Sequence, residues 1–172
     1  MFLRIGILML MFCTVSISTK ANPTVNQATV CFQTMLDEAK GGASFSSMVE
    51  SYVAFSALAA RAVQFQKQMV WNDLSRSEQD LYIEAIHAYF DEEADKVTSN
   101  VGANEYVVLD TVTLRPRYHK KVKGGYQLAG IYTTYGGGQE NFALHIVQSD
   151  GQCYIYDARW RDAWLSKYVS LP

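Results

Sequence analysis

The sequence predicts an α+β fold in which three N-terminal helices pack on one face of a four-stranded antiparallel meander sheet. In the first hundred residues, apolar side chains recur at steps of three and four, which is the period of a helix that buries one face. After Val101 and Gly102 the period falls to two, and β-branched and aromatic residues become frequent. The later segments are separated by short turn sequences, which indicate antiparallel neighbours.

The three helices are expected at the following places. The first spans residues 23–40 and ends at Gly41-Gly42, because glycine is favoured just after a helix. A second, long helix is expected over residues 48–69, and it is apolar over much of its circumference. Residues 75–78, Ser-Arg-Ser-Glu, have the spacing of a capping box, which predicts the start of a third helix. That helix is expected to fade in the acidic stretch 91–95.

Four strands follow in the second half of the chain. They are expected at residues 104–114, 125–135, 140–148 and 152–158. The connections are residues 116–125, Gly136-Gly137-Gly138 and Ser149-Asp150-Gly151, all rich in turn-forming residues.

Residues 1–21 have the three parts of a secretory signal peptide. A basic residue, Arg4, precedes an apolar run over residues 5–17, and small residues at positions 19 and 21 suit a signal peptidase. We expect cleavage after Ala21, which leaves residues 22–172 as one domain. A membrane anchor is disfavoured because the apolar run is shorter than the ~20 residues that a spanning helix needs.

The two cysteines that remain after cleavage are Cys31 and Cys153. An exported protein meets an oxidising compartment, so a disulfide between them is the first expectation. The alternative is a pair of buried thiols that act as small apolar groups.

The charge of the mature chain is acidic but unevenly distributed. Thirteen Lys and Arg oppose seventeen Asp and Glu, which gives no support for nucleic-acid binding. One predicted connection nevertheless concentrates basic residues: Arg115, Arg117, His119, Lys120, Lys121 and Lys123. Two interpretations stay open. The charges keep a sheet edge soluble and unpaired, or they dock to an acidic partner or to anionic lipid head groups.

The sequence has no motif that supports catalysis. His87, His119 and His145 lack a second ligand at a spacing that preassembles a metal site. A G-x-S-x-G nucleophile elbow is absent, and Gly136-Gly137-Gly138 lacks the following Lys of a phosphate-binding loop. A Ser-His-Asp triad stays open, since such groups meet in space. We expect no enzyme activity, no metal and no cofactor.

The predicted helices and strands carry more apolar residues than one buried face needs. In the third strand, Phe142, Leu144 and Ile146 alternate with the apolar Ala143 and Val147. Either the sheet is covered on both sides by ordinary core packing, or the surplus lines a cavity for an apolar ligand.

Two stretches of the chain resemble a known family. Residues 55–90 contain FSALAARAV, Trp71, LSRSEQ and IEAIHAYF, and the C-terminal part contains GQCYIYDARWRDAWLSKY, in which Asp157, Leu165 and Tyr168 fall near family positions. These stretches resemble the periplasmic phospholipid-binding proteins of the Mla pathway (MlaC type), also described as toluene-tolerance proteins. The chain is a divergent and short version of that pattern.

The resemblance implies a soluble periplasmic carrier, a monomer, that shuttles phospholipid between inner- and outer-membrane lipid-transport complexes as an accessory to an ABC transporter. The bound phospholipid is the ligand, and its acyl chains lie in an apolar cavity between helices and sheet. Periodicity, and not the family, supplies the expected lining residues: Phe55, Leu58, Val63, Trp71, Tyr126, Leu128, Tyr132, Phe142, Leu144 and Ile146.

Two other functions remain possible on the sequence. The cone-shaped α+β fold of nuclear-transport-factor-like and steroid-isomerase-like domains also places helices before a curved sheet, and it binds or converts a small apolar ligand. In that case Asp110, His145 and Asp157 are the candidate acids or bases. The third possibility is an interaction module that uses the basic connection.

Overall fold

The computed structural model describes residues 24–149, 151–160 and 163–172. The expected signal peptide, residues 1–21, and its cleavage site lie outside the described residues. Within them the predicted class is confirmed: the protein is α+β, with its main helices N-terminal to an antiparallel sheet. No helix in the described part of the chain is long and apolar enough to cross a membrane.

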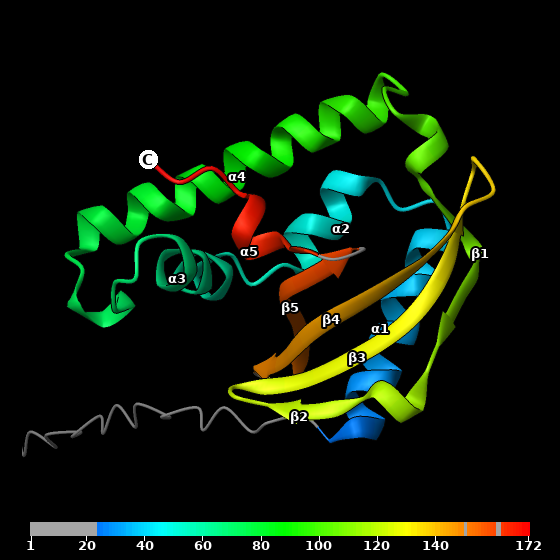
Figure 1. The fold of residues 1–172 in the computed structure, drawn as a ribbon, viewed down its shortest axis with the longest axis horizontal. Helices are drawn as coiled ribbons and strands as arrows, with labels where there is room; N and C mark the ends of the chain where they lie inside the picture. The colour runs from blue at the N-terminus through cyan, green and yellow to red at the C-terminus, as the bar shows by residue number, and fades with distance from the viewer. Residues whose placement is uncertain (1–23, 150, 161–162) are drawn as a thin grey trace, which may run out of the picture.

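The first helix, α1 (Val25–Lys40), matches its prediction. Thr24 and Gln27 form a capping box at its start, and Gly41 follows its last residue. Its apolar face is buried against the strongly curved sheet, where α1 contacts β1, β3 and β5 (Figure 1).

The prediction of one long second helix is wrong. The structure has two helices instead, α2 (Phe45–Tyr52) and α3 (Phe55–Gln66). Between them, Val53 forms a parallel bridge with Ile155, and the Ala54 N–H donates to the Ile155 carbonyl at 2.8 Å. Residues 45–66 contain neither Gly nor Pro, so no local signal marks this break. The helix ends because its backbone pairs with a strand that is distant in sequence.

The third predicted helix is α4 (Arg76–Thr98), preceded by a short 3-10 turn, η1 (Trp71–Asp73). The predicted capping box of Ser75 and Glu78 is present. The helix continues through the acidic stretch where it was expected to fade. Lys96 explains this, because its Nζ lies 2.8 Å from both the Glu92 and the Glu93 carboxylates and offsets their repulsion.

The sheet contains six strands in the described residues, and all their pairings are antiparallel. The strands are β1 (Val107–Leu114), β2 (Lys120–Val122), β3 (Gly125–Thr134), β4 (Gln139–Ser149), β5 (Gln152–Trp160) and β6 (Ala163–Trp164). The order is β1-β3-β4-β5-β6, with β2 paired to the start of β3 on the edge that β1 also occupies.

The predicted meander is therefore correct, but the number of strands is not. The four expected strands correspond to β1, β3, β4 and β5. The expected connection 116–125 contains β2, and it begins with the 3-10 turn η3 (Pro116–Tyr118). The elements β6, α5 (Leu165–Tyr168) and η2 (Ala103–Glu105) were also not predicted.

The expectation that three helices share one face of the sheet needs correction as well. One buried cluster lies between α1 and the sheet, and a second lies among α3, α4 and α5. The helix α4 packs mainly on α2 and α3, and in Figure 1 it lies on the side of these helices away from the sheet. The sheet face itself is covered by α1 and α2, with α3 and α5 reaching β5.

A buried charge network joins the two clusters. Asp157 of β5 is fully buried, and its carboxylate accepts hydrogen bonds from the Arg61 guanidinium of α3 and from the backbone N–H and hydroxyl of Ser166 in α5. The Gln66 side chain donates to the carbonyls of Ser166 and Val169 and so satisfies the end of α5. Polar contacts therefore hold α3 and α5 on β5.

Replacing Asp157 should destabilise the protein strongly. In Asp157→Asn, the Arg61 charge loses its partner, and removing one member of a buried ion pair costs about 3–5 kcal/mol. Because the Arg61 side chain is still 25% exposed, we expect the lower end of that range. The measurement is the free energy of unfolding in urea.

The matched control is Asp80→Asn. The Asp80 side chain is 57% exposed in its pair with Arg76, so its loss should change the free energy of unfolding by less than about 1 kcal/mol. Equal losses in the two variants would show that the Asp157 network does not hold α3 and α5 in place.

Candidate ligand-binding pocket

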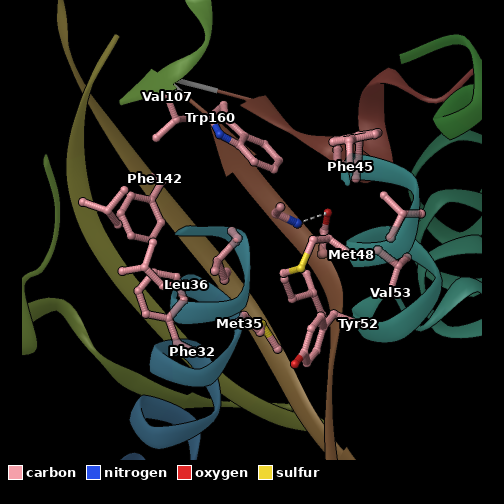
Figure 2. A pocket seen from close by; sticks show the side chains of 18 of the residues that line it. Phe32, Met35, Leu36, Phe45, Met48, Tyr52, Val53, Val107, Phe142 and Trp160 are labelled. Carbon is pink, nitrogen blue, oxygen red and sulfur yellow. Dashed lines mark hydrogen bonds between the residues drawn. The ribbon is translucent and has the colours of Figure 1, made fainter. Parts of the chain in front are cut away.

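An apolar pocket of about 290 Å³ lies between α1, α2 and the sheet. Figure 2 shows Phe32 and Leu36 of α1, with Phe142 of β4, facing Phe45, Met48 and Val53 of the α2 segment across it. Asp157 is the one charged residue among its described lining residues. The volume is close to the lower end of the range for small-molecule sites, about 300–1,000 Å³.

The helices α1 and α2 supply opposite walls of the pocket, and their lining residues have the same sequence spacing. In α1 the lining residues are Phe32, Met35, Leu36 and Ala39, and in α2 they are Phe45, Met48, Val49 and Tyr52. Both sets follow the i, i+3, i+4, i+7 pattern of a single helix face. Because the chain breaks at Val53 and Ala54, α2 runs in a different direction from α3. It can therefore present this apolar face to α1.

The sheet wall of the pocket depends on a close approach between β3 and β4 and on a register shift in β1. A Cβ on Gly130 would lie 2.5 Å from both the Phe142 ring and the Thr113 carbonyl oxygen, so glycine lets Phe142 of the neighbouring strand lie against β3. In β1 the register shifts between Val108 and Thr113. Leu109 and Val112, within this bulge, both line the pocket.

The bulge in β1 is stabilised by Thr111. Its hydroxyl donates to the Val108 carbonyl and accepts from the Thr133 N–H, both at 2.7 Å. A side chain thus replaces the ladder hydrogen bond that the bulge removes.

The pocket opens to solvent beside the end of α1. Among its lining residues, Phe45 and Trp160 are exposed and Ala39 is half-buried. Next to this opening, Lys40 pairs with Asp110 at 3.2 Å and joins α1 to β1. The pocket can therefore be entered from solvent without unfolding either buried cluster.

The structure distributes the sequence-predicted lining residues over three places. Leu58, Phe142 and Leu144 line the pocket. Leu128, Tyr132 and Ile146 are buried in the cluster under α1, with Tyr126 partly buried beside them. Phe55 and Trp71 pack in the cluster of α3 and α4, and Val63 is fully buried on α3, all outside the pocket wall.

The α1 and α2 walls of the pocket were not predicted from the sequence. The apolar face of α1 and the positions Met48 and Tyr52 were visible as helix periodicity. Whether these two faces enclose a pocket depends on the angle between the two helices. Hydrophobic periodicity within one helix carries no information on that angle.

The three candidate acids or bases do not form a reactive group in the pocket. The Asp110 side chain is 88% exposed and paired with Lys40. His145 alternates with Leu144 and Ile146 and so lies on the opposite face of β4, where its Nε2 is 3.2 Å from the Gln127 Oε1. Asp157 lines the pocket, but its carboxylate oxygens are occupied by Arg61, Ser166 and the Ala158 N–H.

Metal ligands are not clustered in the described residues. No group of three or more His, Cys, Asp or Glu side chains there is arranged to hold a metal ion. His87 instead stacks on Phe55 with 3.8 Å between ring centroids, and the His119 Nε2 lies 3.2 Å from the Ala129 carbonyl oxygen.

Cys31 of α1 and Cys153 of β5 lie next to each other as free thiols. Burial, and then hydrogen bonding to the Cys153 thiol, raise the pKa of the Cys31 thiol. The fold therefore brings together the two cysteines that the sequence predicts to pair, and the disulfide stays a prediction.

The basic residues of the 116–125 connection lie along η3 and β2, at the end of the sheet away from α2 (Figure 1). None of these lysines and arginines forms an ion pair with a carboxylate of the described residues. Both interpretations of this segment stay open.

Comparisons with known proteins place the chain in no family. No protein-family model matches the sequence, and no curated protein matches it either.

Buried His145 should make the protein less stable in acid. Burial, followed by the positive charges of Arg61, Lys120 and Arg159, lowers the pKa of His145 from 6.5 to about 4. Above pH 6.5 the ring is neutral in both states. Between pH 6.5 and 4 the unfolded chain binds the proton more readily, so the free energy of unfolding should fall, by about 2–3 kcal/mol at pH 4.5.

This contribution can be isolated with His145→Gln. Urea unfolding of both proteins at pH 7.0 and pH 4.5 should show a smaller acid-induced loss in the variant. An identical loss in the two proteins would contradict the prediction.

The cysteine pair should be oxidised in exported protein. Thiol labelling in denaturant without reductant should find no free thiol, and two labelled thiols per chain would contradict the bridge. Reduction should then lower the free energy of unfolding by about 2–4 kcal/mol, because the bridge closes a long loop in the unfolded chain. A Cys31→Ser, Cys153→Ser variant is the control and should not respond to reductant.

Proposed function

We propose that the protein is a lipid carrier whose pocket holds an acyl chain of a phospholipid. The observation that carries this proposal is an open cavity with an apolar wall, placed between two helices and a curved sheet. Moving each methylene from water into such a pocket contributes ~0.8 kcal/mol. Water exclusion then supplies the affinity, and the pocket needs no reactive group.

The more specific proposal is a periplasmic carrier of the Mla type that acts as a monomer, is exported with a cleaved signal peptide, and passes phospholipid between inner- and outer-membrane complexes. The resemblance of residues 55–90 and 151–168 supports it. Two residues that carry this resemblance, Asp157 and Leu165, belong to the pocket wall.

The cone-type enzyme is the weaker alternative. Its acid or base would have to face the ligand with a free oxygen or nitrogen. Asp157 is the candidate that reaches the pocket, and its carboxylate is held by Arg61 and Ser166. This arrangement favours binding over conversion of the ligand.

A cross-strand pair of leucines gives the stability test. Leu144 lines the pocket, whereas its partner Leu128 is fully buried in the cluster below and does not line it. Truncating a leucine in a packed core costs about 2–5 kcal/mol, because a new void adds to the lost transfer free energy. Leu128→Ala should fall within this range. Leu144→Ala should cost less, since it enlarges an existing cavity.

The binding test uses titration of a phospholipid with a fluorescent acyl chain. Wild-type protein stripped of lipid should bind it, and Ala39→Trp, which adds bulk at the half-exposed opening, should remain folded and bind it at least tenfold more weakly. The control Ala88→Trp lies on the exposed surface of α4, outside this pocket, and should bind like wild type. Absence of binding by the wild type would overturn the carrier proposal.

A further inference from the structure

The basic and acidic residues of the chain are segregated. Residues 51–72, 111–139 and 163–172 carry eight Lys and Arg and no Asp or Glu. The first segment contains α3 and the last contains β6 and α5, and these elements pack together beside β5. The middle segment contains η3, β2 and β3. Figure 1 shows α3 and the turn between β2 and β3 on the same side of the molecule, so the fold brings the acid-free segments to one side.

One face of the sheet joins these segments. The strand register places Lys120 of β2 opposite Gln127 of β3, and Gln127 opposite His145 of β4. In the neighbouring row, Arg159 of β5 lies opposite Trp164 of β6. The Trp164 ring stacks on His145 with 4.2 Å between the ring centroids. Because adjacent residues of a strand point to opposite faces, this face is turned away from the pocket.

A row of cations and aromatic rings continues this face onto α3 and α5. The Arg61 guanidinium carbon lies 5.0 Å from the Phe65 ring centroid and 5.5 Å from the Trp164 ring centroid. The Arg159 guanidinium carbon lies 5.8 Å from the Trp164 ring, and the Lys167 Nζ lies 5.6 Å from the Phe65 ring. These contacts hold cations against ring faces. The surface formed by Lys120, Arg159, Trp164, Arg61, Phe65 and Lys167 is called the cationic face below.

Most charges of the cationic face have no carboxylate partner. Arg61 pairs with Asp157, which is fully buried. Lys120, Arg159 and Lys167 form no ion pair with a carboxylate in the part of the chain that the structure describes. The Lys120 and Lys167 side chains are exposed. The face is therefore complementary to a partner with negative charge.

Apolar side chains are exposed beside these charges. Phe65 is 44% exposed, and in the loop that follows α3 Met69 is 39% and Val70 61% exposed. At a bilayer surface, cations meet anionic head groups while aromatic rings and apolar side chains reach the interface with the hydrocarbon. A partner that offered only carboxylates would leave these apolar side chains in water. The combination favours a membrane over an acidic protein.

We propose that the cationic face is a docking surface for a membrane that contains anionic phospholipids. The negative head groups neutralise Lys120, Arg159 and Lys167, and Phe65 with the following loop reaches the membrane interface. This inference goes beyond the proposed function, since the cationic face includes none of the residues at the pocket opening and needs no ligand in the pocket.

The test is cosedimentation of the protein with two kinds of vesicle, one of pure phosphatidylcholine and one of an equal mixture of phosphatidylcholine and phosphatidylglycerol. The wild type should bind the mixed vesicles at least about tenfold more tightly than the neutral ones, because each unpaired cation near an anionic surface contributes about a fivefold effect. Added salt should reduce binding, since it screens exposed charges.

The variant Lys120→Gln, Lys167→Gln should bind the mixed vesicles about fivefold more weakly for each charge removed. Phe65→Ser should also weaken binding, but it should leave the salt dependence as in the wild type. The matched control is Lys40→Gln, Arg76→Gln, which removes two cations that pair with carboxylates outside the cationic face. This control should bind like the wild type, and urea unfolding checks that all three variants are folded.

The variant Ala39→Trp separates docking from uptake into the pocket. It adds bulk at the pocket opening and should still bind the mixed vesicles like the wild type. Loss of vesicle binding in this variant would show that the pocket, and not the cationic face, meets the membrane. If the acyl-chain titration fails while docking persists, the carrier proposal falls and the docking surface stands.

Three further results would overturn the docking surface. One is equal binding to the neutral and the mixed vesicles. Another is an equal loss of binding in the charge variant and its control. The third is binding of soluble polyglutamate without binding of the mixed vesicles, which would assign the cationic face to an acidic protein partner instead.

Discussion

The pairing of Val53 and Ala54 with Ile155 is the constraint on which the rest of the structure depends. Among the described residues, β6 pairs with the outer edge of β5 at Arg159 and Trp160, so the edge near Ile155 is left for another segment. By pairing there, Val53 and Ala54 end α2 and start α3 in a new direction. One helix thereby becomes two, and α2 can face α1 across a space.

That space is kept apolar by the way the adjacent polar groups are satisfied. Asp157 borders the pocket, and a buried carboxylate without partners would draw water into it. The Arg61 guanidinium of α3 and the hydroxyl and N–H of Ser166 in α5 donate hydrogen bonds to this carboxylate and so satisfy it. The same contacts fasten the second cluster to the sheet, so stability and a dry pocket wall have a common origin.

The two cavities that α1 borders differ in their chemistry. The pocket between α1, α2 and the sheet is lined by apolar side chains. A groove of about 790 Å³ between α1, α2 and the strands β4 and β5 is lined by amides, carboxylates and tyrosines instead. Both depend on α1, whose apolar face turns toward the sheet while the neighbouring positions, such as Thr34 and Glu38, line the groove. A single helix therefore contributes to both environments through its own amphipathic pattern.

The sequence by itself determined the elements whose signals are local. The capping box of Ser75 and Glu78, the end of α1 at Gly41 and the four long strands follow from hydrogen bonding and side-chain periods within a few residues. Leu58, Phe142 and Leu144 were found as pocket residues because apolar surplus on a helix or strand is also a local property. Only the tertiary structure decided that the helix breaks at Val53, that β1 bulges and that α1 and α2 enclose the pocket. These features arise from backbone pairing and packing between segments far apart in the chain, and no pattern within either segment records its partner.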